Sequence, residues 1–175
     1  SELAVVTDRI DKAAIEKACR MICDAEKIVL YGCGREGLHM QGFAMRLFHL
    51  GFDVAMQGSM TTPPIGPGDL FLVSDGPGRL STVGSLTDVS RAAGAKVVLF
   101  TAEPHTPIAT KSDHTINIPA QTMARDQGTA ASSLLPMGSL YEGALFLLFE
   151  VMVLRLREMT NTSAADMRAR HTNLE

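Results

Sequence analysis

An apolar segment runs directly into a glycine-rich turn at Ile28-Val29-Leu30-Tyr31-Gly32-Cys33-Gly34-Arg35-Glu36-Gly37. Glycines at this spacing let the backbone turn sharply at the end of a strand and approach a ligand closely. The helical pattern that follows would offer free N–H groups to an anion. The stretch therefore predicts a strand, a tight turn and a helix, as in the first unit of a parallel α/β sheet.

The same glycine spacing occurs in dinucleotide-binding folds, where an Asp or Glu about 20 residues further on holds a ribose hydroxyl. The next predicted strand, at 53–56, carries its only acid, Asp53, at its start and not at its end. We therefore expect no nicotinamide or flavin cofactor. Two interpretations stay open here: a tight turn without a ligand, and one wall of a site for a small anionic or polyhydroxy ligand.

The composition is that of one globular domain of ordinary size. The chain has 175 residues, of which 46% are apolar and 20% are charged. A net charge of −3 without a basic stripe argues against a nucleic-acid partner, and no apolar run reaches the ~18 residues of a membrane span. Three cysteines cannot pair evenly, which suits a reducing compartment, so we expect a cytoplasmic protein.

Helical and strand patterns alternate along most of the chain. We expect a long first helix at 8–25, strands without polar alternation at 27–31, 53–56, 69–74, 96–100 and 114–118, and helices at 36–50, 80–93 and 106–111. Such strands are typical of a parallel sheet covered by helices on both faces. The prediction is a three-layer α/β/α sandwich whose five parallel strands have the order 2-1-3-4-5.

Ligands of such sheets bind beyond the carboxyl ends of the strands, near the point where the strand order reverses. The loops 32–37 and 75–82 meet there. We therefore expect the chemistry at this edge of the sheet.

The segment 139–175 differs from the rest. A helix at about 139–159 is apolar nearly all round, and a short helix follows at 164–170. A helix of this kind must be covered on every side. In a chain of this size a subunit interface is the natural cover, so we expect 139–175 to contribute to a homo-oligomer.

Two carboxylates on this helix differ in position. Glu142 lies in its first turn, where it is either an acid favoured by the helix dipole or a general base in a half-buried site. Glu150 lies further along and is expected to form an ion pair with Arg155 or Arg46. The five histidines do not cluster at the spacing of metal ligands, so we expect no metal site.

In the segments 135–142 and 170–171, the chain resembles the 6-phospho-3-hexuloisomerases of the sugar isomerase (SIS) domain superfamily. The resemblance is collinear from about residue 8 to the end, and its most specific segments are Leu135-Pro136-Met137-Gly138-Ser139-Leu140-Tyr141-Glu142 and Arg170-His171. Further matches are Gly32-Cys33-Gly34-Arg35, Thr62-Pro63 and the segment 43–51. The family implies one SIS domain over 1–175 with a flavodoxin-like fold, a tetramer, and an enediol isomerisation without metal or organic cofactor.

The resemblance also implies roles for individual residues. Glu142 would be the base that moves a proton between adjacent carbons, His171 would come from a neighbouring subunit to assist oxygen proton transfers, and Arg46 would support the polar site. Enediol chemistry needs such a base and donors for the developing oxyanion. We expect the sugar to be bound by the two loops and by one threonine from the Thr-Pro match, namely Gly34, Arg35, Glu36, Asp75, Gly76, Gly78, Arg79, Ser81, Thr82 and Thr62.

The second loop departs from the family pattern. The family loop reads Ser-Gly-Ser-Gly-Glu-Thr and cradles phosphate, whereas this chain has Asp75-Gly76-Pro77-Gly78-Arg79-Leu80. Pro77 removes a hydroxyl and an N–H donor, and Asp75 adds a negative charge, as does Glu36 in the first loop, where the family has Ser. Arg79 could compensate by a bidentate contact to phosphate. The phosphate site is either rebuilt or lost.

Three functions are consistent with these residues. The leading one is a sugar phosphate isomerase with an altered phosphate end. The alternatives are a sugar or sugar-phosphate binding protein without catalysis, and an isomerase of a non-phosphorylated sugar, with Asp75 and Glu36 accepting hydrogen bonds from hydroxyls.

Overall fold

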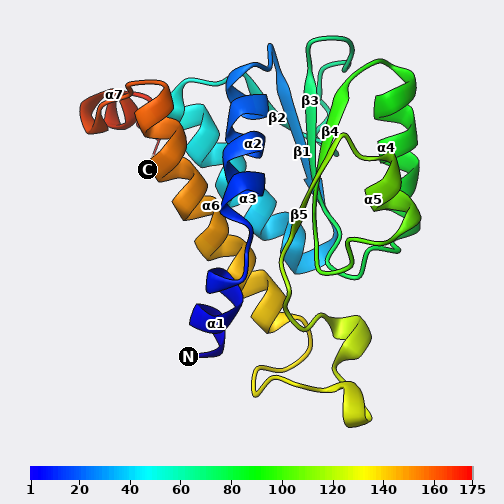
Figure 1. Cartoon of the computed structure of the whole chain (residues 1–175). Coiled ribbons are helices and arrows are strands. Elements are labelled where there is room, and N and C mark those ends of the chain that lie inside the picture. Colours follow the sequence, from blue (N-terminus) through cyan, green and yellow to red (C-terminus); the bar gives the residue numbers. More distant parts are fainter. Residues whose placement is uncertain (175) are drawn as a thin grey trace.

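A five-stranded parallel sheet forms the centre of the molecule (Figure 1). The computed structural model describes residues 1–174. The strands lie in the order β2-β1-β3-β4-β5, with bounds Val54–Met56 (β2), Ile28–Gly32 (β1), Leu70–Ser74 (β3), Lys96–Thr101 (β4) and His114–Asn117 (β5). The predicted α/β fold, strand order and parallel pairing are therefore confirmed.

Helices cover both faces of this sheet. One face carries α2 (Lys12–Cys23), α3 (Gly34–Leu50) and α6 (Ser139–Met159), and the other carries α4 (Ser81–Ala92) and α5 (Pro107–Lys111). Alternate strand residues enter the two cores because successive side chains of a strand point to opposite faces: Leu72 packs toward α3 and α6, and Val73 toward α4. Burial on both faces explains why the strands show no polar alternation.

The N-terminal helical region begins earlier and is more broken than predicted. The helix predicted at 8–25 is α2, which starts only at Lys12, and a separate helix, α1 (Glu2–Asp8), precedes it. The side chain of Asp11 accepts a hydrogen bond from the backbone N–H of Ala13 at 2.8 Å and so caps α2. An Asp in this position favours a helix start over a helix interior, because its carboxylate satisfies an otherwise unpaired N–H group.

Helix α6 packs along α3 and α2 and is only partly covered by the rest of the chain. Its inner residues are buried, with the Phe149 ring stacked on Phe43 at 4.2 Å between ring centroids. Its outer side leaves four large apolar side chains exposed, and α3 adds three more, together called here the outer apolar face: Phe146, Leu147, Val151, Leu154, Leu38, Met45 and Phe48. The helix was expected to be apolar nearly all round, and one side of it has no cover from the described residues 1–174.

The two ends of α6 lie far apart (Figure 1). Its N-terminus follows the connection 118–138, which contains two short 3₁₀ turns at Met123–Arg125 and Gly128–Ala130. Its C-terminus leads to α7 (Ala164–Ala169), which packs against α3. No helix formed by residues 1–174 has the length and apolar character to span a lipid bilayer.

Candidate active site

The glycine-rich turn brings the end of β1 and the start of α3 into close contact. A Cβ atom at Gly37 would lie 2.5 Å from the carbonyl oxygen of Gly32, and Gly34 has a φ of +56°. Only glycine tolerates both the contact and the left-handed conformation without a cost. The turn places Arg35 and Glu36 in the first turn of α3, at the carboxyl edge of the sheet.

Glu36 lies at the centre of a buried hydrogen-bond network. Its carboxylate accepts hydrogen bonds from Ser74 Oγ at 2.5 Å and from the backbone N–H of Gly76 at 3.0 and 3.2 Å. Ser74 Oγ also lies 3.1 Å from the hydroxyl of the buried Tyr141. The network ties α3, the end of β3 and the start of α6 together.

Burial raises the pKa of Glu36 to about 7, and the nearby Asp75 and Glu142 carboxylates add to the increase. The hydrogen bonds from Ser74 and Gly76 act in the opposite direction but are outweighed. A carboxyl group with such a pKa can change its protonation state near neutral pH, so the charge of this hydrogen-bond network depends on pH.

The side chain of Asp75 does not face the expected ligand site but points into its own loop. Its side chain is fully buried, and its two oxygens accept hydrogen bonds from the backbone N–H groups of Gly78 at 2.7 Å and Leu80 at 3.0 Å. Burial raises the pKa of Asp75 despite these bonds. The carboxylate therefore holds its own loop together in the manner of an Asx turn.

Glu142 faces the first loop from the start of α6. Its Oε2 atom lies 2.8 Å from Arg35 Nη2, although not in hydrogen-bonding geometry, and it is buried. Arg35 also donates a hydrogen bond to Ser139 Oγ at 3.4 Å and is more than half exposed. Glu142 thus has a nearly buried carboxylate oxygen, Oε2, that is free to accept a hydrogen bond, and the exposed guanidinium of Arg35 lies beside it.

These residues line a cavity of about 310 Å³, which is the size of a site for a small molecule. Its walls come from both loops, the start of α6 and the connection before it: Cys33, Gly34, Arg35, Glu36, Pro77, Leu80, Thr122, Met123, Met137, Gly138, Tyr141 and Glu142. We call this the carboxylate cavity. No group of three or more His, Cys, Asp or Glu side chains within 1–174 is arranged to hold a metal ion.

Other predicted site residues lie elsewhere. Gly76 does not line the carboxylate cavity but donates a hydrogen bond to Glu36, which does, and Gly78, Arg79 and Ser81 line a different cavity of about 490 Å³ next to His105. Thr82 is exposed in the first turn of α4. Thr62 Oγ1 donates hydrogen bonds to the carbonyl oxygens of Met56 and Ser59, within its own turn.

Arg46 and His171 are not beside Glu142 in this chain. Arg46 forms an ion pair with Glu150 at 3.2 Å, one of the two expected partners, and Glu150 is about 12 Å along α6 from Glu142. The ring of His171 lies 5.3 Å from the ring of His49, near the C-terminal end of α3. Within one chain, the predicted catalytic residues therefore occupy opposite ends of the α3–α6 pair.

Two residues of the network were not predicted as site residues. Ser74 ends a fully buried strand, and Tyr141 precedes Glu142 in an apolar helix. The available signal was a hydroxyl-bearing residue at the carboxyl end of a strand and another in an apolar helix, since buried hydroxyls need partners.

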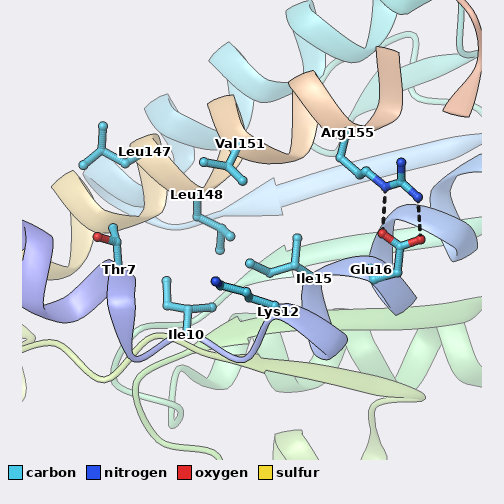
Figure 2. A pocket seen from close by; sticks show the side chains of 9 residues that line it. All are labelled: Thr7, Ile10, Lys12, Ile15, Glu16, Leu147, Leu148, Val151 and Arg155. Carbon is cyan, nitrogen blue, oxygen red and sulfur yellow. Dashed lines mark hydrogen bonds and ion pairs between the residues drawn. The ribbon is translucent and has the colours of Figure 1, made fainter. Parts of the chain in front are cut away.

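A second hollow, of about 350 Å³, lies between α1, α2 and α6 (Figure 2). Its lining is mainly apolar, with Ile10, Ile15, Leu148 and Val151 facing one another in the view. The Arg155 guanidinium closes one end through two bonds to Glu16, at 2.8 and 2.9 Å. This hollow adjoins the outer apolar face and lacks the convergent polar groups of the carboxylate cavity.

Known proteins resemble this chain in sequence and structure. The SIS domain matches residues 21–147. A 3-hexulose-6-phosphate isomerase of Mycobacterium gastri is 35% identical over 174 residues, covering 99% of this chain and 86% of its own, and one of Bacillus subtilis is 31% identical over 154 residues, covering 88% and 83%.

A Methanococcus jannaschii protein, whose crystal structure was taken to infer a 3-hexulose-6-phosphate isomerase function, has a TM-score of 0.83 at 26% identity, covering 94% of this chain and 87% of its own. The family model covers most of this chain, and the relatives match it nearly from end to end. The fold agrees with that match. The chain belongs to the SIS domain family.

Proposed function

We propose that this protein is a sugar isomerase that moves a carbonyl group between adjacent carbons through an enediol, with Glu142 as the carbon base. The observation that carries the proposal is the placement of Glu142. It is a nearly buried carboxylate with an available oxygen, on the wall of a cavity at the carboxyl edge of the sheet. The names of the relatives support the same class of reaction.

The step requires one base that can serve two neighbouring carbons. Glu142 would take the proton from the hydroxyl-bearing carbon next to the carbonyl group, leaving an enediolate. The same proton, or one from solvent, would return to the former carbonyl carbon, while a proton moves between the two oxygens. A buried carboxylate suits this role because it is poorly solvated and held in place by its helix.

Neighbouring groups can bind the oxygens of the enediol. Arg35 lies at 2.8 Å from Glu142 and can donate to a developing oxyanion while keeping the carboxylate oriented. Gly34 and Glu36 bound the same cavity. His171 of a second copy would complete the oxygen proton transfers, in a homo-oligomer that also includes the segment 139–175 in its interface. Arg46 would act through its ion pair with Glu150.

Exchange with deuterated water tests the mechanism directly. Incubation of fructose and of fructose 6-phosphate with the wild type in D₂O should introduce deuterium at the carbon next to the carbonyl and form the 3-ketose. Glu142→Gln should lower both rates by about 10²–10⁴-fold. Glu158→Gln, at an exposed acid on the same helix, is the matched control and should retain activity.

Two results would overturn the proposal. One is an equally active Glu142→Gln variant. The other is a wild type that binds the sugar, as seen by a rise in Tm, without isomerisation or deuterium incorporation. That second result would instead establish a binding protein.

A further inference from the structure

The turn at 76–80, which follows β3, has almost no backbone donor left for an anion. The N–H of Gly76 is bonded to Glu36, and those of Gly78 and Leu80 are bonded to Asp75. Pro77 has no N–H group. The backbone N–H of Arg79 also acts on Asp75: together with those of Leu80 and Gly78 it opposes the rise in the pKa of that carboxyl group.

Loops that cradle phosphate do so with free backbone N–H groups and hydroxyls. In this turn two carboxylates already occupy the position of the anion. Asp75 fills the inside of the turn, and Glu36 covers its first N–H from the side of the carboxylate cavity. The crowding is tight, because a Cβ atom at Gly76 would lie 2.8 Å from Glu36 Oε1 and 3.0 Å from the Tyr141 ring.

The charges around the carboxylate cavity also oppose a dianion. Among the residues that line it, Arg35 is the cation, and it is paired with Glu142. Arg79, the cation within the turn, lines the other cavity beside His105. A phosphate entering the carboxylate cavity would meet the carboxyl group of Glu36 on the lining, with the buried Asp75 carboxyl group inside the adjoining turn and no unpaired cation on the lining to offset them.

We propose that the carboxylate cavity takes a sugar that carries a hydroxyl, and not a phosphate, at the end that meets the turn 76–80, with Glu36 and Asp75 as the residues that determine this specificity. The inference rests on the proposed function, since it names the substrate class of the same site. A sugar hydroxyl can donate a hydrogen bond to the Glu36 carboxylate, whereas a phosphate dianion has no proton to donate.

Titration calorimetry with a matched pair of ligands tests the proposal. Fructose and fructose 6-phosphate are compared at pH 8, where Glu36, with its pKa of about 7, is largely ionised. The wild type should bind the unphosphorylated sugar more tightly, and inorganic phosphate up to 10 mM, on the order of ten times a typical metabolite Kd, should not displace it.

Two substitutions should reverse the preference without changing side-chain size. Glu36→Gln keeps a group that can accept from Gly76, and Asp75→Asn keeps an acceptor for its loop. The double variant should gain at least about tenfold in affinity for fructose 6-phosphate, while its affinity for fructose stays within about threefold. Asp53→Asn, which removes an exposed charge outside the cavity, should change neither affinity. Circular dichroism and Tm establish that each variant is folded.

The outcomes separate this inference from the proposed function. A wild type that binds fructose 6-phosphate as tightly as fructose, or more tightly, overturns the inference even if it isomerises both sugars. A folded double variant without a gain for the phosphorylated sugar also overturns it. Preferential binding of fructose without isomerisation supports the specificity and contradicts the proposed reaction.

Discussion

The two ends of α3 are built in opposite ways. At its N-terminal end, the buried Glu36 accepts hydrogen bonds from Ser74 and Gly76, so this hydrogen-bond network is formed within one chain. At its C-terminal end, the ring of the exposed His171 lies 5.3 Å from that of His49 and is tilted to it, and Arg170 donates a hydrogen bond to the His49 carbonyl oxygen at 3.0 Å. Because α3 is about 25 Å long, these ends cannot form one site in the same chain.

This difference indicates which part of the active site a second copy of the chain would have to supply. The carboxylate cavity has its own walls and base, whereas the oxygen-handling histidine that the resemblance implies is at the far end of the helix pair. The outer apolar face between these ends has no cover within the described chain. We therefore expect the complete site to form from two copies, and four experiments bear on that expectation and on the N-terminal end of α3.

Mixing two inactive variants should give the largest effect. Glu142→Gln and His171→Ala should each lower kcat by about 10²–10⁴-fold, because each removes one proton-transfer group. When the two are co-expressed, about a quarter of the sites should contain both native groups if these come from different copies. The measurement is kcat per site of the mixed assembly. Activity no higher than that of the separate variants would place His171 outside the site.

Removing the charge of Glu36 should stabilise the protein at high pH. The pKa of Glu36 is about 7 in the folded chain and has a reference value of 4.5. The folded state therefore holds this proton more tightly, and the resulting stability is lost as pH rises from about 4.5 through 7. The free energy of unfolding of the wild type should therefore fall by up to about 3 kcal/mol over this range, and that of Glu36→Gln should not.

The measurement is the free energy of unfolding of wild type and variant at pH 5 and pH 8.5. The free energy of unfolding of Glu36→Gln, relative to that of the wild type, should be higher at pH 8.5 than at pH 5. A difference independent of pH would mean that the carboxyl group titrates normally.

A charge on the outer apolar face should weaken assembly. Val151 and Leu154 are exposed on α6, and an aspartate at either position would be buried without a partner if a second copy covers it. Val151→Asp should weaken self-association by about 100-fold, or about 2.7 kcal/mol. Light scattering across a dilution series reads this out. Val89→Asp, at a 63% exposed valine on α4, is the control for a charge on another face.

Two glycine substitutions on α3 should have opposite effects on stability, one at the glycine-rich turn and one in the middle of the helix. Gly37→Ala should destabilise the protein by about 1–3 kcal/mol, because its Cβ would lie 2.5 Å from the Gly32 carbonyl oxygen. Gly42→Ala has nothing within 4 Å of the new Cβ and should stabilise α3 by up to about 1 kcal/mol. Urea unfolding measures both. Equal effects would show that the turn is not a point of close packing.

Periodicity was sufficient for the sheet but not for every helix. The continuous apolar run Val97-Val98-Leu99-Phe100 indicates a strand covered on both sides, and such strands alternating with helices leave few topologies. The predicted helix start at residue 8 was wrong, because one helix ends at Asp8 and Asp11 caps a new one that starts at Lys12.

The candidate site was predicted in part for a similar reason. Glu142, Arg35 and Glu36 follow from their places at a helix start and a strand end, and these are fixed once the sheet is known. The direction of the Asp75 side chain does not follow from its position, because a carboxylate after a strand can turn toward a ligand or toward its own loop. The same holds for Arg46, which could have faced the cavity and instead pairs with Glu150.

By itself, the sequence determined the α/β class, the strand order, the edge where the loops meet and the two acids, Glu36 and Glu142, that bound the cavity. Apolar periodicity gives the strands and helices, and the rules for connecting parallel strands then give the strand order and the edge at which the loops meet. Only the tertiary structure decided that Asp75 and Glu36 occupy the donors of the turn, and that Glu142 and His171 lie a helix length apart. Both depend on contacts between segments distant in sequence, where burial and hydrogen-bond competition select one orientation among several that the residue type allows.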